Sequence, residues 1–109
     1  MSSEAPADPD RPTEPMRVLV RSSRPRDDES ISVIATVEDR DVHLLDYLMF
    51  GTAAGRIIRI EAYGFVHDTA DRGHSFDFIV TGVDLEQTSP YLEQVIDVRP
   101  GPYCKTQET

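Results

Sequence analysis

Two segments in the first third of the chain alternate apolar and polar residues. In residues 16–23, MRVLVRSS, Val18 and Val20 share one face and the arginines share the other. Residues 30–37, SISVIATV, place every second residue from Ile31 to Val37 on a common apolar face. A period of two is typical of β-strands that bury one side. We therefore predict two strands, joined by the polar loop of residues 22–30.

The next segment, EDRDVHLLDYLMFGTAAG, changes to a different spacing. Its apolar and small residues recur at steps of three and four: Val42, Leu45, Leu48, Met49, Thr52 and Ala53. This spacing is typical of an amphipathic helix. We predict a helix that is capped by Asp39 or Asp41 and ends near Gly55.

Residues 56–67 and 74–85 return to strict alternation. One apolar face of RIIRIEAYGFVH holds Ile58, Ile60, Ala62, Gly64 and Val66, and one face of HSFDFIVTGVDL holds Phe76, Phe78, Val80 and Gly82. If Val66 lies opposite Phe76, small residues of one strand meet large residues of the other on a shared face. This register predicts a hairpin whose tip is residues 68–73.

The segment TSPYLEQVIDVRPG allows two interpretations. Ser89 and Pro90 form a helix start, and Leu92, Val95 and Ile96 give one apolar stripe. Residues 95–98 also fit a short edge strand. The predicted fold class is α+β, an antiparallel sheet of four strands, or five with residues 95–98, in the order ββαββ followed by this helix or strand. One main helix packs on one face of the sheet.

Composition divides the chain of 109 residues into one predicted domain and two tails. Residues 1–15 are acidic and proline-rich, which predicts a disordered tail, and residues 100–109 are expected to form a flexible C-terminal tail. Residues 16–99 then form a single domain. No apolar run approaches the roughly 18 residues of a membrane span, so we expect a cytoplasmic protein with no membrane contact.

Charge and cysteine content narrow the classes of partner and cofactor. The net charge of −9 makes direct nucleic-acid binding an unfavoured function, because phosphate contacts need clustered cations. The single Cys104 provides neither an internal disulfide nor a cysteine metal site. We expect no cofactor.

The stretch HDTADRGHSFD, residues 67–77, concentrates histidine and aspartate. Its residue types fit a metal site with His67, His74 and Asp71 as ligands, or an acid/base site with His67, Asp68 and Asp77. Both chemistries need rigid ligands or a pocket that shifts pKa values, and an exposed turn supplies neither. The favoured interpretation is therefore the polar tip of a hairpin.

Apolar residues also occupy positions predicted to face outward. These positions are Ile57, Tyr63, Phe65, Ile79 and Val83. A sheet face in contact with water would carry polar residues there, so we predict an interface. The favoured function is a small, non-catalytic protein-interaction domain, either self-associating or an accessory subunit of a larger assembly. The alternatives are a small enzyme or ligand-binding domain that uses residues 67–77, and an acidic inhibitor of a basic surface.

Overall fold

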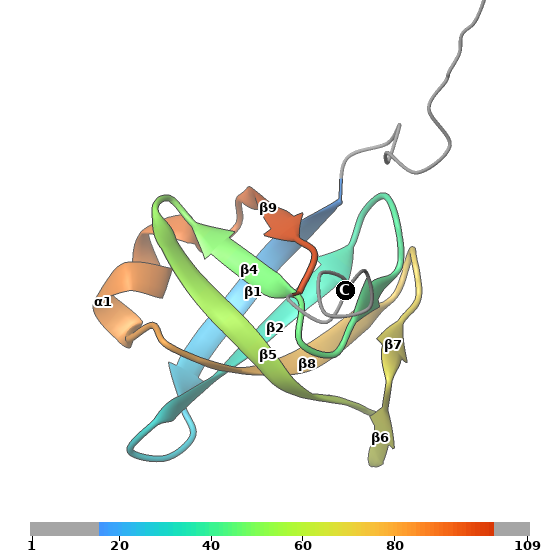
Figure 1. Cartoon of the computed structure of the whole chain (residues 1–109), viewed down its shortest axis with the longest axis horizontal. Helices are drawn as coiled ribbons and strands as arrows, with labels where there is room; N and C mark the ends of the chain where they lie inside the picture. Colours follow the sequence, from blue (N-terminus) through green and yellow to red (C-terminus); the bar gives the residue numbers. More distant parts are fainter. Residues whose placement is uncertain (1–15, 102–109) are drawn as a thin grey trace, which may run out of the picture.

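The computed structural model describes residues 16–101, so both predicted tails lie outside the described residues apart from Pro100 and Gly101. Strands account for 58% of the structure and helices for 8%. The elements are β1 (Arg17–Pro25), β2 (Ser30–Val37), β3 (Val42–His43), β4 (Tyr47–Phe50), β5 (Ala53–Ala62), β6 (Phe65–His67), β7 (Thr69–Ala70), β8 (Ser75–Thr81), α1 (Leu85–Thr88), the 3-10 helix η2 (Ser89–Tyr91) and β9 (Val95–Arg99) (Figure 1).

Six of these strands form a closed antiparallel barrel. Their order is β4-β9-β1-β2-β8-β5, and β5 pairs with β4 to close the ring. Strand β5 pairs with β4 on one side and with β8 on the other, and β9, which follows β8 in the chain, returns to pair with β4. This order of strands is a Greek-key arrangement. Closure gives every strand of the ring a neighbouring strand on each side. Strand β6 lies outside the ring and pairs with β5 alone in this sheet.

The core fills the barrel interior with apolar side chains from all six strands. On β8 the alternation predicted from the sequence places Phe76, Phe78 and Val80 inward. Phe78 is fully buried and is the largest of the fully buried side chains. Its strand, β8, pairs with β2 on one side and with β5 on the other, so Phe78 packs in the barrel interior between these two strands.

The predicted α+β class is wrong because residues 39–55 form no helix. This segment contains β3, a turn, β4 and the start of β5. Leu48 and Phe50 are buried and alternate with half-buried neighbours, so the strand period of two accounts for the same apolar residues. Gly51, with φ of 69°, begins the two-residue connection between Phe50 and Ala53. Glycine at the first position of a two-residue loop favours a tight hairpin and not a helix end.

The predicted pairing of residues 56–67 with residues 74–85 has the wrong register. Val80 lies opposite Ile57 and Phe78 lies opposite Ile60, whereas the sequence placed Val80 opposite Ala62. The chain instead reverses at residues 63–64, so that β6 pairs with the end of β5. The predicted hairpin tip at residues 68–73 is therefore a connection that contains β7.

A β-bulge in β5 places Ile57 and Ile58 on the faces opposite to those predicted, whereas Ile60 beyond the bulge is buried as predicted. The register shifts between Ile57 and Arg59, and an extra residue reverses the alternation at that point. As a result Ile57 is buried in the barrel and Ile58 is exposed, the opposite of their predicted sides.

For residues 89–98 the sequence allowed a helix or a strand, and the structure has a short helical turn followed by a strand. Ser89–Tyr91 form a single 3-10 turn with proline near its start, and residues 95–99 form β9. The preceding α1 has four residues and is capped by Asp84, whose side chain accepts a hydrogen bond from the Gln87 amide. Within the described range, no helix is long and apolar enough to cross a membrane.

Asp46 connects the β3–β4 turn to the end of the described chain. It is 1% exposed, and its carboxylate accepts hydrogen bonds from the amides of His43 and Gly101, each at 2.9 Å. Burial raises the pKa of Asp46 by more than the hydrogen bonds from His43 and Gly101 lower it. This carboxylate is therefore a structural anchor inside the protein.

Candidate functional site

The β5–β6 hairpin projects from the barrel and carries its most exposed aromatic residues. Ala62 pairs with Phe65, so Tyr63 and Gly64 form a two-residue loop. Both have positive φ, 55° for Tyr63 and 80° for Gly64, which is the signature of a type I′ turn. In Figure 1 this hairpin lies at the lower right, away from α1.

Side chains on and beside the hairpin are open to solvent. Tyr63 is 85% exposed, Phe65 is 70% exposed and Val66 is 56% exposed. Ile58, which the bulge turns outward on β5, is 47% exposed. We call Ile58, Tyr63, Phe65 and Val66 the hairpin surface.

A groove lies beside the hairpin, on the outer side of the sheet. Its volume is about 310 Å³, and its lining includes the hairpin residues 62–66 together with Arg59, Glu61 and Asp77. Glu61 and Asp77 are paired across β5 and β8, which places their side chains next to each other. The groove therefore combines apolar and aromatic surface with two carboxylates and one guanidinium.

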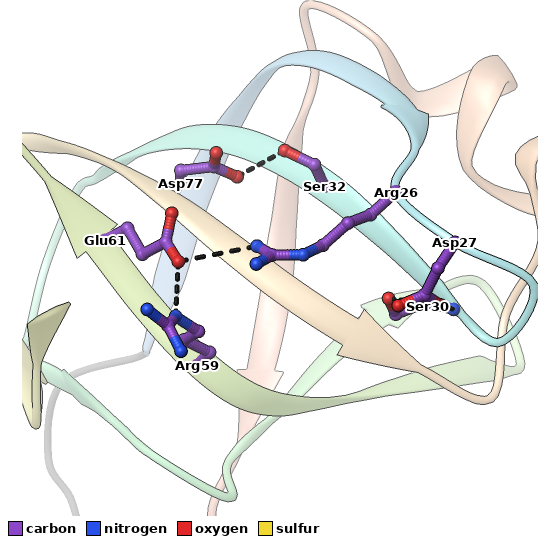
Figure 2. Close-up of polar contacts among 7 residues, drawn as sticks. All are labelled: Arg26, Asp27, Ser30, Ser32, Arg59, Glu61 and Asp77. Atoms are coloured by element: carbon purple, nitrogen blue, oxygen red, sulfur yellow. Dashed lines mark hydrogen bonds and ion pairs between the residues drawn. The ribbon is translucent and has the colours of Figure 1, made fainter. Parts of the chain in front are cut away.

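An ion-pair network surrounds these carboxylates (Figure 2). Arg59 bonds to Glu61 from the same strand, and Arg26 reaches across β8 to the same carboxylate at 3.4 Å. Burial raises the pKa of Glu61, but the guanidiniums of Arg59 and Arg26 together outweigh it, so the pKa lies below its usual range. Two arginines thus hold Glu61 in its charged form.

Asp77 is in a different electrostatic environment from Glu61. Its carboxylate accepts a short hydrogen bond from the Ser32 hydroxyl on β2. Within the described part of the chain, Asp77 forms no ion pair. Arg59 and Arg26 therefore offset the charge of Glu61, whereas Asp77 is the groove carboxylate without an ion-pair partner among the described residues.

The residues weighed as an alternative acid/base group do not come together. Asp77 points outward from β8, because its neighbour Phe76 points into the barrel. His67 lies on the Phe76 side, with the two rings edge to face at 5.5 Å, and its Nε2 is 3.4 Å from the Ala62 carbonyl oxygen. Asp68 is exposed on the connection to β7. The sheet separates His67 from Asp77.

The residues considered as metal ligands are also dispersed. His74 is exposed just before β8, whereas Asp71 lines a second, polar groove of about 580 Å³ with residues 39–41, His43 and Arg72. In that groove, Asp41 accepts a hydrogen bond from the Arg72 amide at 3.0 Å. Among residues 16–101, no three histidine, cysteine, aspartate or glutamate side chains are placed to hold a metal ion.

The five predicted interface residues divide between surface and interior. Tyr63 and Phe65 are on the hairpin surface, whereas Ile57 is fully buried and Val83 is 9% exposed, both within the core. Ile79 is 2% exposed although it faces outward between Phe78 and Val80. Only Tyr63 and Phe65 of the five are therefore accessible for contact.

Sequence reasoning did not identify Ile58, Val66, Arg59 or Glu61 as part of this surface. One available signal was the pair Tyr63-Gly64, because a two-residue connection with glycine between alternating segments indicates a hairpin. The bulge that exposes Ile58 has no comparable signal in the sequence. Comparison of the chain with protein-family models and with curated proteins finds no match.

Proposed function

We propose that the protein is a non-catalytic protein-interaction domain that contacts its partner through the hairpin surface. The observation that carries this proposal is the combination of Tyr63 and Phe65, 85% and 70% exposed, on a hairpin outside the closed barrel. Neighbouring exposed apolar side chains on a soluble domain usually mark an interaction site. Tyrosine and other aromatic residues are also enriched among the residues that dominate binding energy.

Tyr63 supports the proposal by a second argument, its backbone conformation. Type I′ turns favour asparagine or glycine at this position, and a bulky residue with positive φ is unusual. Tyr63 has φ of 55° and its side chain is mostly in solvent, so the fold gains little from a tyrosine here. A residue that is unfavourable for the backbone and unused by the core is best explained by a contact outside the monomer.

The first prediction concerns stability. Tyr63→Asn is expected to raise the free energy of unfolding by about 0.5–1 kcal/mol, because asparagine followed by glycine fits a type I′ turn. Chemical denaturation of the variant and the parent protein measures the difference. Phe65→Ser is the matched change at a neighbouring exposed aromatic without positive φ, and it should bring no such gain. A clear loss of stability in Tyr63→Asn would mean that the tyrosine has a structural role.

The second prediction tests binding directly. A photoreactive phenylalanine analogue at position 63 or 65 should form a discrete covalent adduct with a protein when it is activated in cells that produce the protein. The control position is Val95, which is 49% exposed on β9, a strand that pairs with neither β5 nor β6. Mass spectrometry then identifies the partner as a second copy or another protein.

The same adduct from position 95, or no adduct from positions 63 and 65, would contradict the proposal. The first outcome would indicate non-specific contact, and the second would leave the exposed aromatics without a protein partner. The adduct should also disappear when the analogue at position 65 is combined with Tyr63→Asn, because both residues belong to one contact.

A further inference from the structure

We propose that the partner supplies an extended segment that adds as a strand to the open edge of β6 and places a basic side chain in the neighbouring groove. This inference rests on the proposed function and specifies its binding mode and partner chemistry. It depends on three features of the described residues: an open strand edge, a groove carboxylate without an ion pair, and exposed aromatic rings.

The edge of β6 is open. Apart from the two-residue strands β3 and β7, β6 is the one strand of residues 16–101 that lies outside the closed ring. Natural edge strands are commonly protected by being very short or by lysine, proline or inward-facing charges. Strand β6 is short, with three residues, but Phe65-Val66-His67 contains no lysine, proline or carboxylate. An open apolar edge of this kind fits the recognition mode in which an extended peptide continues a sheet.

The hairpin geometry identifies the backbone groups that would pair. The turn hydrogen bond joins Ala62 and Phe65, so in an antiparallel ladder the next pair, Glu61 and Val66, is not hydrogen-bonded. The N–H and C=O of Val66 therefore point away from β5, toward the open edge. A partner strand meets one donor and one acceptor there, between the side chains of Phe65 and His67.

The groove selects the charge of the partner side chain. Glu61 is paired with both Arg59 and Arg26, whereas Asp77 forms no ion pair among the described residues, so Asp77 is the groove carboxylate that can receive a cation from a partner. Tyr63, in the turn, also lines this groove, and aromatic faces attract guanidinium and ammonium groups. The protein as a whole has a net charge of −9, which also favours a basic partner.

Charge and area argue against a second copy as the occupant. Two copies carry −9 each and repel each other on approach. A fully buried aromatic side chain contributes roughly 150–250 Å² of contact area. The two aromatic residues of the hairpin surface, together with the partly exposed Ile58 and Val66, therefore offer less than the about 800 Å² per partner that a standard stable interface buries. A surface of this size suits one short segment of another protein.

Two fluorescein-labelled hexapeptides of alternating valine and arginine, or alternating valine and glutamate, are suitable probes for fluorescence anisotropy at low salt. The full chain should bind the arginine peptide at least tenfold more tightly than the glutamate peptide. Val66→Pro removes the outward N–H and should weaken the arginine peptide at least tenfold, whereas Val66→Thr, which keeps the N–H and a branched side chain, should not. Proline is tolerated on an edge strand, and thermal unfolding of the variant verifies that it folds.

Asp77→Asn is a second variant that tests the charge of the groove without altering the edge. It should reduce the preference for the arginine peptide at least threefold, and this result remains informative if Val66→Pro fails to fold. Equal binding of the two peptides, or arginine-peptide binding unaffected by Val66→Pro in a folded variant, would overturn the inference.

Two further measurements exclude other occupants. A doubled molar mass in light scattering that returns to the monomer in Val66→Pro would show that a second copy occupies the edge, and a labelled single-stranded oligonucleotide that binds more tightly than the arginine peptide would show a nucleic-acid site. Either result overturns the inference. If the photoreactive analogue at position 63 forms adducts with another protein but the full chain binds neither peptide, the proposed interaction function stands and strand addition at β6 is wrong.

Discussion

Phe78→Ala is expected to lower the free energy of unfolding by about 4 kcal/mol, the largest effect of a single substitution considered for this protein. Phe78 is fully buried on β8, between β2 and β5, and truncation removes a ring from a closed interior. Phenylalanine-to-alanine changes in cores typically cost about 3–5 kcal/mol, because the cavity is only partly filled by relaxation. Urea denaturation followed by far-ultraviolet circular dichroism measures the loss.

Phe65→Ala is the matched control, since it makes the same chemical change on the hairpin surface. Phe65 is 70% exposed, so this variant should lose no more than about 0.5 kcal/mol of stability and should instead lose contact with the partner. The two variants together separate the barrel from the proposed interface. Similar losses of stability in both would show that the hairpin packs as part of the core.

The local strand signals of the sequence were sufficient for β1, β2 and the inward face of β8. In these segments the period of two continues without a long interruption, and Val33 and Phe78 face the core as the alternation predicts. Residues 42–53 were different, because the short strands β3 and β4, the turn between them and the start of β5 place apolar residues at spacings that also fit a helix. Tertiary pairing with β5 and β9 decides between the two, and that information is not local.

Tyr63 and Phe65 were predicted as outward-facing positions of a long strand. They are exposed for a different reason, because Tyr63 lies in the turn at residues 63–64 and Phe65 directly follows it. Ile57 and Ile58 were assigned to the wrong sides because the bulge between Ile57 and Arg59 interrupts the alternation, so the alternation that is correct for Ile60 fails for Ile57 and Ile58. The groove carboxylate Asp77 was identified, but its partner Ser32 comes from a strand 45 residues earlier and required the folded barrel.

Asp46→Ala is expected to lower the free energy of unfolding by about 2–3 kcal/mol at neutral pH. The substitution leaves the amides of His43 and Gly101 without their acceptor, and a buried donor without a partner costs roughly 1–3 kcal/mol. Gly101 is itself buried, so water does not readily replace the carboxylate there. Exposed Asp84→Ala loses only a helix cap and is expected to cost about 1 kcal/mol, which makes it a suitable comparison.

The pH dependence of stability separates the charge of Asp46 from its hydrogen bonds. Burial is the main reason that the pKa of Asp46 is raised, so between the unfolded value of about 3.9 and the higher folded value the native state binds more protons than the unfolded state. Its contribution to stability is therefore largest below that window and declines as pH rises through it. Asp46→Asn keeps one acceptor and cannot titrate, so the advantage of the parent protein over this variant should shrink as pH increases from about 4 toward neutrality. A constant difference across this range, measured by denaturation at each pH, would mean that Asp46 ionises equally readily in the folded and unfolded states.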